Sequence, residues 1–290
     1  MDNRLFSYSP SIERPPIEWP NGARTAFWVG LNIEYYAIDK PSTSITPITA
    51  TLVPDPLNYG WRDYGTRVGV WRTMQLLDRL GMRGSVLLNA DVCDYYPQII
   101  EEGNKRNWVW LAHGKSNSIL QANMELEQER AYLTELVATI KSKTGKQPRG
   151  WLGPALSETF NTPDLLAEQG VEYICDWCND DQPYPMRVKN GRMISVPYSI
   201  EVNDIPVFLD KGLEAEGFYR MIVDQFDVLH EEGGKVMAVA LHPFLTGLPF
   251  RHKYLARALE YVASHKDVWL ATSDEIASWY YDHYYDATTK

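Results

Sequence analysis

Short apolar runs alternate with longer amphipathic stretches along most of the chain. Apolar runs of up to about eight residues, bounded by turn-forming residues, are typical of strands buried on both faces. They lie at residues 26–33, 85–88, 108–111, 150–152, 171–175, 236–241 and 268–271. Helical spacing of apolar residues occurs between them, at residues 64–80, 97–105, 125–144, 215–231 and 253–265, and in helices opening at Thr162 and Thr272. Strands that alternate with helices imply parallel pairing, so the pattern predicts an α/β barrel or a doubly wound sheet.

The chain of 290 residues is long enough for one barrel or for two smaller domains. No internal repeat or linker divides it, so we expect a single domain over residues 26–290. Residues 1–25 are rich in proline and polar groups and are expected to form an arm on its surface. The loop at residues 41–59 is too long for an idle connection, which favours a rim or lid over the site.

Composition and charge narrow the class of partner. Hydrophobic residues make up 44% of the chain and charged residues 23%, which is ordinary for a globular protein. The net charge of −10 argues against nucleic acid, because phosphate contacts require a basic surface. The first 19 residues carry charges and prolines instead of an apolar run, and no stretch reaches membrane-spanning length. We therefore expect a cytoplasmic protein with neither nucleic-acid nor membrane partners.

Three cysteines, Cys93, Cys175 and Cys178, are too few for a disulfide framework. Cys175 and Cys178 have the spacing of a redox or zinc motif, but they follow a predicted strand instead of opening a helix. We interpret them as buried small apolar residues.

Four polar residues follow directly on predicted strands: Glu34, His113, Asp176 and His242. The carboxyl ends of parallel barrel strands meet at one face, where such barrels carry their sites. A carboxylate with two imidazoles supplies a base to activate water and an acid to protonate a leaving nitrogen. The alternative is that each residue is separately structural.

Around these residues the sequence resembles the NodB-like polysaccharide deacetylase family, over residues 19–279 or so. The family's motifs fall on residues 32–35, 113–117, 150–154, 176–181 and 241–243. Residues 64–67 and 203–204 are especially similar to the branch of cofactor-independent allantoinases and intracellular peptidoglycan-deacetylase-like proteins. The resemblance implies a distorted TIM-like (β/α) barrel with seven or eight strands, carbohydrate or small-amide metabolism, and hydrolysis of a non-peptide carbon–nitrogen bond.

From these motifs we expect Glu34 to be the general base and His242 the general acid. His113, with backbone N–H groups near Gly114 and Gly153, is expected to stabilise the oxyanion. The substrate, a small amide, ureide or N-acetyl compound, is expected to contact Arg67, Asn117, Trp151, Asp176, Asp180, Asp181, Asn203 and Asp204.

The motifs depart from the metal-dependent members of the family. Those members have an aspartate pair in the first motif and a second histidine four residues after the first, where this chain has Glu34 and Asn117. Catalytic zinc requires three protein ligands, and only Glu34 and His113 match. We expect no cofactor. The alternatives are a deacetylase that binds zinc through Glu34, His113 and His242, and a barrel that binds a small molecule without catalysis.

The C-terminal segment is aromatic, with Trp279, Tyr280, Tyr281, Tyr284 and Tyr285 within seven residues. The helical period cannot turn all of them toward one core. Aromatic residues are enriched at interfaces, and the family resemblance favours a homo-oligomer with this segment and the N-terminal arm at the contact. The alternative is that the aromatic residues pack on the arm of the same chain.

Overall fold

The sheet is the organising element of the fold. The computed structural model describes residues 3–122 and 124–288, and it contains a curled sheet in the order β6-β7-β5-β4-β3-β2-β1-β8, with β9 also paired to β1. All pairs are parallel except β6 with β7. The strands are β1 (Thr25–Ile33), β2 (Gly84–Leu88), β3 (Val109–Ala112), β4 (Gly150–Trp151), β5 (Tyr173–Ile174), β6 (Tyr184–Met186), β7 (Met193–Ser195), β8 (Lys235–Leu241) and β9 (Val268–Leu270).

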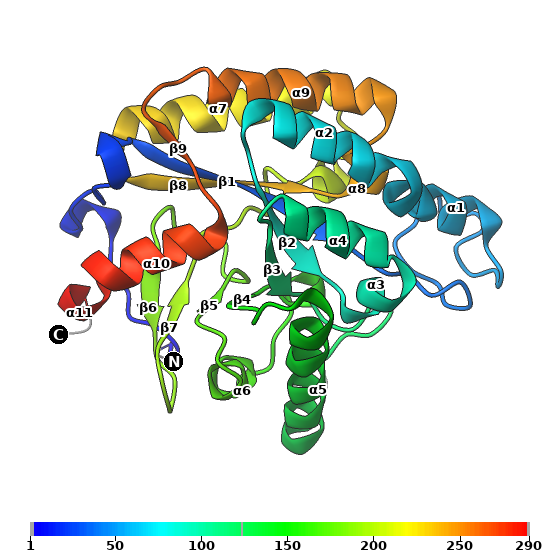
Figure 1. Cartoon of the computed structure of the whole chain (residues 1–290), viewed down its shortest axis with the longest axis horizontal. Helices are drawn as coiled ribbons and strands as arrows, with labels where there is room; N and C mark the ends of the chain where they lie inside the picture. The colour runs from blue at the N-terminus through cyan, green and yellow to red at the C-terminus, as the bar shows by residue number, and fades with distance from the viewer. Residues whose placement is uncertain (1–2, 123, 289–290) are drawn as a thin grey trace.

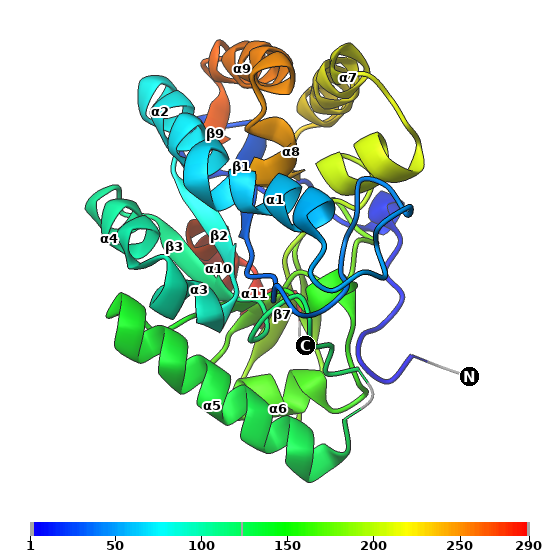
Figure 2. The same ribbon diagram turned by 90° about the vertical axis from the view of Figure 1, so that its right-hand side faces the viewer.

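Helices cover the outer face of this sheet. In Figures 1 and 2, α7, α9, α2, α4 and α5 follow one another as an arc around it, in agreement with the packing of α7 on α9, α9 on α2 and α4 on α5. The helices are α1 (Pro56–Tyr64), α2 (Val70–Leu80), α3 (Ala90–Tyr95), α4 (Pro97–Lys105), α5 (Leu126–Thr144), α6 (Thr162–Glu168), α7 (Ala215–Glu232), α8 (Pro243–Thr246), α9 (Pro249–Ala263), α10 (Ser273–His283) and α11 (Tyr285–Thr288). No described helix is both long and apolar enough to cross a membrane.

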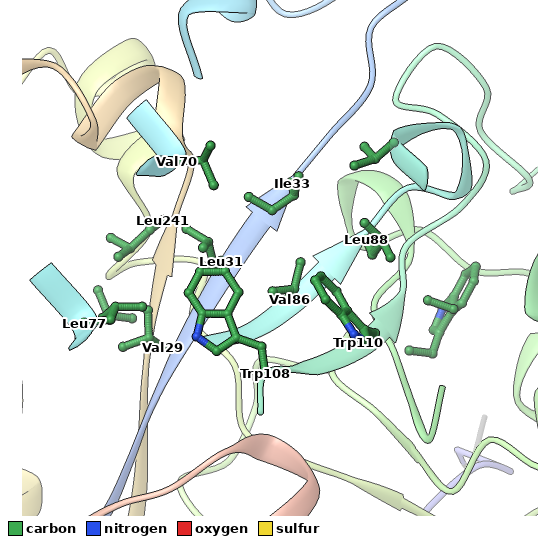
Figure 3. Close-up of a cluster of buried hydrophobic side chains, with 14 of the residues drawn as sticks. Val29, Leu31, Ile33, Val70, Leu77, Val86, Leu88, Trp108, Trp110 and Leu241 are labelled. Atoms are coloured by element: carbon green, nitrogen blue, oxygen red, sulfur yellow. The ribbon is translucent and has the colours of Figure 1, made fainter. Parts of the chain in front are cut away.

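Strand β1 is buried on both faces, and its two faces enter two different cores. Val29, Leu31 and Ile33 point outward and pack against α2 and the neighbouring strands, as Figure 3 shows. Trp28 points into the curl of the sheet, where it meets residues of β2, β3 and β8. Because successive side chains of a strand alternate between faces, the inward row continues through Asn32 to Glu34.

The distorted barrel is thus confirmed, as a half-barrel whose end strands β6 and β8 are not paired with each other. The loop that contains Asn203 lies along the free edge of β8 and pairs with it through one isolated parallel bridge, between Asn203 and Ala240. Residues 179–215 were expected to form irregular strands and loops over the site, and the structure places the short strands β6 and β7 among them. Their stretch holds prolines and charges that conceal a hairpin from the periodicity.

The predicted helix over residues 64–80 is longer than expected and is interrupted. It begins at Pro56 and passes through a π-helical turn at Gly65–Gly69 before α2. A Cβ atom on Gly69 would lie 2.1 Å from the carbonyl oxygen of Pro243. The glycines therefore allow this turn to lie directly on α8, next to His242.

The aromatic C-terminal segment packs on the arm of its own chain. The Trp279 indole donates to the Glu18 carbonyl at 2.9 Å, and the Tyr284 hydroxyl accepts from the Glu18 amide at 2.7 Å. Tyr280 is buried, and Tyr281 donates to the Glu172 carbonyl. Contacts with the N-terminal arm of the same chain therefore account for much of the burial of these aromatic side chains. The homo-oligomer and the division between arm and barrel stay predictions.

Candidate active site

Glu34 is the centre on which the other polar residues converge. It follows β1, is 7% exposed, and its Oε1 atom lies 3.3 Å from His113 Nε2 and 3.6 Å from His242 Nε2. His113 is the first residue after β3, and His242 is the first residue after β8. The structure thus brings together the three residues expected at the strand ends.

His242 lies between two carboxylates. Its Nδ1 contacts Asp204 Oδ1 at 2.6 Å, and its backbone N–H donates to Asp204 Oδ2 at 2.7 Å. Burial alone would lower the pKa of His242, but Asp204 and Glu34 raise it to about 10. The imidazole is therefore protonated at neutral pH. Asp204 was expected to bind substrate; since it is completely buried against His242, it holds and charges this imidazole instead.

His113 has a neutral partner. Its Nδ1 donates to the backbone carbonyl of Leu152 at 2.6 Å. A carbonyl oxygen can only accept, so this contact places a proton on Nδ1 and leaves Nε2 to face Glu34. The two imidazoles present the same nitrogen to the same carboxylate, but only one of them has an acidic partner behind it.

Both oxygens of Glu34 accept further hydrogen bonds. Asn117 Nδ2 donates to Oε1 at 2.5 Å, and the Tyr36 hydroxyl donates to Oε2. Burial would raise the pKa of Glu34, but His242 and His113 hold it well below its usual range. These contacts therefore favour the carboxylate form of Glu34.

Asn89 joins the first and second motifs, a role that the sequence analysis missed. Its Oδ1 accepts from the backbone N–H of Tyr35 at 2.9 Å, and its Nδ2 donates to the carbonyl of His113 and to Asn117 Oδ1. Asn89 points inward from the end of β2 by the same period-two alternation as Glu34. That alternation was the available signal for it. Tyr36 had no comparable signal.

Asp176 lies close to His113, as expected, but it occupies the Gly153 N–H, which was expected to stabilise the oxyanion. The backbone N–H of Gly153 donates to Asp176 Oδ1 at 2.6 Å, so it is not free for an oxyanion. Trp151 is completely buried and offers no ring face to a substrate.

Four other residues expected to contact substrate have partners outside the Glu34 centre. Asp180 pairs with Arg14 of the arm at 2.8 Å, and the Asp181 carbonyl accepts from Val236 at the start of β8, the edge opposite His242. The loop after β5 thus returns to the amino-terminal edge of the sheet, a path that the spacing of residues in the sequence cannot show. Asn203 accepts from the Ile205 amide and bridges to β8. Arg67 is exposed and paired with Asp63, whereas the buried arginine nearby is Arg62.

Arg62 lies 4.9 Å from the centre of the Tyr36 ring and donates to the Thr43 carbonyl. Arg62 thereby connects the predicted rim loop at residues 41–59 to Tyr36, whose hydroxyl donates to Glu34. Cys93 and Cys175 are buried, as expected, whereas Cys178 is only partly buried. Burial raises the pKa of the Cys178 thiol to about 12 and that of Cys175 well above its usual value.

The residues do not fit a catalytic metal. Within residues 3–122 and 124–288, no group of three or more His, Cys, Asp or Glu side chains could hold one. Asn117 and Tyr36 donate into both Glu34 oxygens, the atoms that would have to bind the ion. We therefore derive no step through a metal.

Comparison with known proteins identifies the relatives of this chain. No protein-family model matches it. A "Putative polysaccharide deacetylase" of Schizosaccharomyces pombe is 28% identical, over 93% of this chain and 94% of that protein. The crystal structure of a probable polysaccharide deacetylase from Pseudomonas aeruginosa PAO1 superposes with a TM-score of 0.85 at 28% identity, covering 93% of this chain and 95% of that one. The resemblance to polysaccharide deacetylases is confirmed.

A second solved structure that is similar to this chain has a different named activity. The crystal structure of Puue allantoinase matches with a TM-score of 0.85 at 26% identity, covering 96% of this chain and 99% of that one. Polysaccharide deacetylases and an allantoinase therefore share this fold nearly end to end with the present chain, in agreement with the branch that the motifs indicated.

Proposed function

We propose that the protein is a metal-independent hydrolase of a non-peptide carbon–nitrogen bond in a small amide, ureide or N-acetyl compound. The observation that carries the proposal is the convergence of two imidazoles, with different partners behind them, on the buried carboxylate of Glu34. The named activities of the deacetylase and allantoinase relatives support carbon–nitrogen bond hydrolysis.

The two histidines have different tasks in this proposal. His242 is protonated at neutral pH and gives its proton to the leaving nitrogen, as expected from the sequence. Glu34 alone is a weaker base than expected, because the imidazoles stabilise its charge. Glu34 still takes the proton from water, and its Oε1 stays in contact with His113 Nε2 at 3.3 Å. The Gly114 N–H keeps its proposed place at the oxyanion.

The test is turnover of a panel of linear amides, cyclic ureides and N-acetyl sugars by the purified protein. Glu34→Gln keeps the size of the side chain but removes the charge that both imidazoles face, and we expect the rate to fall at least about a thousandfold. Dialysis against a strong chelator should leave wild-type activity unchanged.

Two results would contradict parts of this proposal. Loss of activity with chelator, restored by zinc, would establish instead a deacetylase with substituted ligands. Tight binding of a panel compound without turnover in either protein would establish a barrel that binds without catalysis.

We also propose a cytoplasmic homo-oligomer without nucleic-acid or membrane partners. The three free cysteines and the net charge of −10 support the location and the absent partners. For assembly, the support is the partly exposed aromatic surface that remains at Trp279 and Tyr284. Light scattering at micromolar concentration should give a multiple of 33.3 kDa; the monomer mass would reject the oligomer.

A further inference from the structure

The two oxygens of Glu34 have different surroundings. Three groups face Oε1, namely the side-chain amide of Asn117 and the imidazoles of His113 and His242. Oε2 accepts from the Tyr36 hydroxyl and, in the described part of the chain, from no second donor. Because a carboxylate oxygen can accept two hydrogen bonds, Oε2 keeps a place for the water molecule that Glu34 activates. A water bound there has the Tyr36 hydroxyl as its immediate neighbour.

The Tyr36 hydroxyl is a hydrogen-bond donor and not an acid. Tyr36 is buried, and burial together with the charge of Glu34 raises the pKa of the phenol well above its usual value, so it keeps its proton. The Thr43 side chain hydrogen bonds to the phenol in the sense that lowers this pKa, so Thr43 donates to the Tyr36 oxygen. The Arg62 guanidinium lies 4.9 Å from the ring centre. An accepted hydrogen bond and a nearby cation both strengthen a hydroxyl as a donor.

The proposed reaction needs such a donor at the carbonyl oxygen of the substrate. Attack by water turns this oxygen into an oxyanion, and one preorganised donor to an oxyanion contributes about 10²–10³ in rate. Two backbone N–H groups were expected there, but that of Gly153 donates to Asp176 Oδ1. The N–H of Gly114 would then act alone. The Tyr36 hydroxyl, next to the place of the attacking water, can supply the second hydrogen bond.

We propose that Tyr36 is a catalytic residue whose hydroxyl turns from Glu34 Oε2 to the carbonyl oxygen of the substrate as that oxygen becomes negative. This inference rests on the proposed hydrolase function and deepens it. In the first step the water oxygen forms a bond to the carbonyl carbon, one water proton passes to Glu34 Oε2, and an electron pair of the C=O bond moves to the oxygen. The negative charge thus leaves the atom that Tyr36 contacts and appears on a neighbouring one.

The hydrogen bond can follow the charge without movement of the ring. Rotation about the C–O bond of the phenol redirects its hydrogen, while the ring stays between the Arg62 guanidinium and Phe244, 6.0 Å away in an edge contact. In the second step His242 protonates the nitrogen, the C–N bond breaks and the C=O bond forms again. The proton held by Glu34 then returns His242 to its charged state, and the Tyr36 hydroxyl turns back to Oε2.

Methylboronic acid imitates the first step without a bond that can be cleaved. Its trigonal boron adds water, releases one proton and becomes a tetrahedral anion, so it matches the carbonyl in shape, charge and proton count. In boron-11 NMR of the full-length protein at neutral pH, where the free acid is trigonal, wild type should give a bound tetrahedral signal. Tyr36→Phe should bind the compound at least about tenfold more weakly, the effect of one hydrogen bond to a charged group. No tetrahedral signal in wild type, or equal affinities of the two proteins, would overturn the proposal.

Kinetics of the hydrolysed compounds test the same role in the reaction. Tyr36→Phe should lower kcat about 10²–10³-fold and leave KM within about threefold, because the hydrogen bond to the carbonyl oxygen forms in the transition state. The matched control is Tyr173→Phe, which loses a completely buried hydroxyl bonded to Ser273 and Asp274 at the start of α10. Its kcat and its boronate affinity should stay within about twofold of wild type. A kcat of Tyr36→Phe within about threefold of wild type would refute the assignment.

A milder change tests the phenol without removing it. Thr43→Val removes the hydroxyl that donates to Tyr36 and keeps the size of a partly exposed side chain. It should lower kcat and boronate affinity by the same factor, about three- to fivefold, and Thr43→Ser should keep both. A loss that appears in KM and not in boronate affinity would show that Thr43 and Tyr36 only support the rim loop, against the proposal.

Failure of this assignment is distinguishable from failure of the proposed function. Glu34→Gln removes the proton acceptor and should abolish both hydrolysis and the tetrahedral boron signal. If Glu34→Gln does so while Tyr36→Phe keeps wild-type kcat, the hydrolase stands and the role of Tyr36 is rejected. A wild-type protein that hydrolyses no compound of the panel would reject the function itself, and the catalytic role of Tyr36 with it.

Discussion

The two histidines of the site differ in what stands behind them. Both direct Nε2 at Glu34, but His242 has the Asp204 carboxylate at its Nδ1 and His113 has the Leu152 carbonyl. A carboxylate fixes the ring and also stabilises its positive charge, whereas a carbonyl only fixes the proton on Nδ1. Of the two imidazoles that face Glu34, only His242 therefore has a second carboxylate that suits it to act as the acid.

Among variants of the two histidines and the residues behind them, the largest effect should come from removing the acid. His242→Asn keeps a polar side chain but cannot protonate a leaving nitrogen, and kcat should fall about 10²–10⁴-fold at pH 7. The loss should be smaller for substrates whose leaving nitrogen is a weak base, because these need less protonation. Equal losses for good and poor leaving groups would show that His242 is not the acid.

Removal of the charge behind the acid should have a smaller effect. Asp204→Asn leaves His242 with Glu34 alone, so burial should pull its pKa down from about 10. Activity at pH 7 should fall about 10–100-fold, and the alkaline limb of the rate profile should move to lower pH. An alkaline limb that stays in place would contradict the pairing.

The same variant has a consequence for stability. A group whose pKa is raised on folding stabilises the protein below its unfolded value, here the ordinary 6.5, and this stabilisation disappears as the pH rises through about 10. In Asp204→Asn the loss should be complete at a lower pH than in wild type, as thermal unfolding across pH 6–11 would show.

The sequence predicted the inward row of the barrel well and the loops poorly. Glu34, His113 and His242 were found because period-two alternation and strand ends are local features. Asp204 had a signal that was not used: it lies between Val202 and Ile205 in an apolar context, and a buried carboxylate needs a partner. Which partner it has depends on the path of the loop beside β8.

Other residues had no signal at all. Glu158 stands between serine and threonine, as a surface turn residue would, and nothing local shows that its carboxyl lies against that of Asp176. Asp180 and Asp181 follow the end of β5 closely, yet the chain carries them to the opposite edge. The direction of a loop is set by tertiary contacts, which residue spacing does not encode.

The smallest effects should separate two arginines that lie five positions apart in the sequence. Arg62 packs 4.9 Å from the ring centre of Tyr36, whose hydroxyl donates to Glu34, so Arg62→Ala should reduce activity about fivefold, the equivalent of a ~1 kcal/mol cation–π contact. Arg62→Ala leaves the contacts of Glu34 with both histidines in place, so the pH profile should keep its shape. Arg67 is 75% exposed and pairs with Asp63 on its own helical segment, so Arg67→Ala should stay within about twofold of wild type. A larger loss in Arg67→Ala than in Arg62→Ala would restore the original assignment of Arg67 to the substrate.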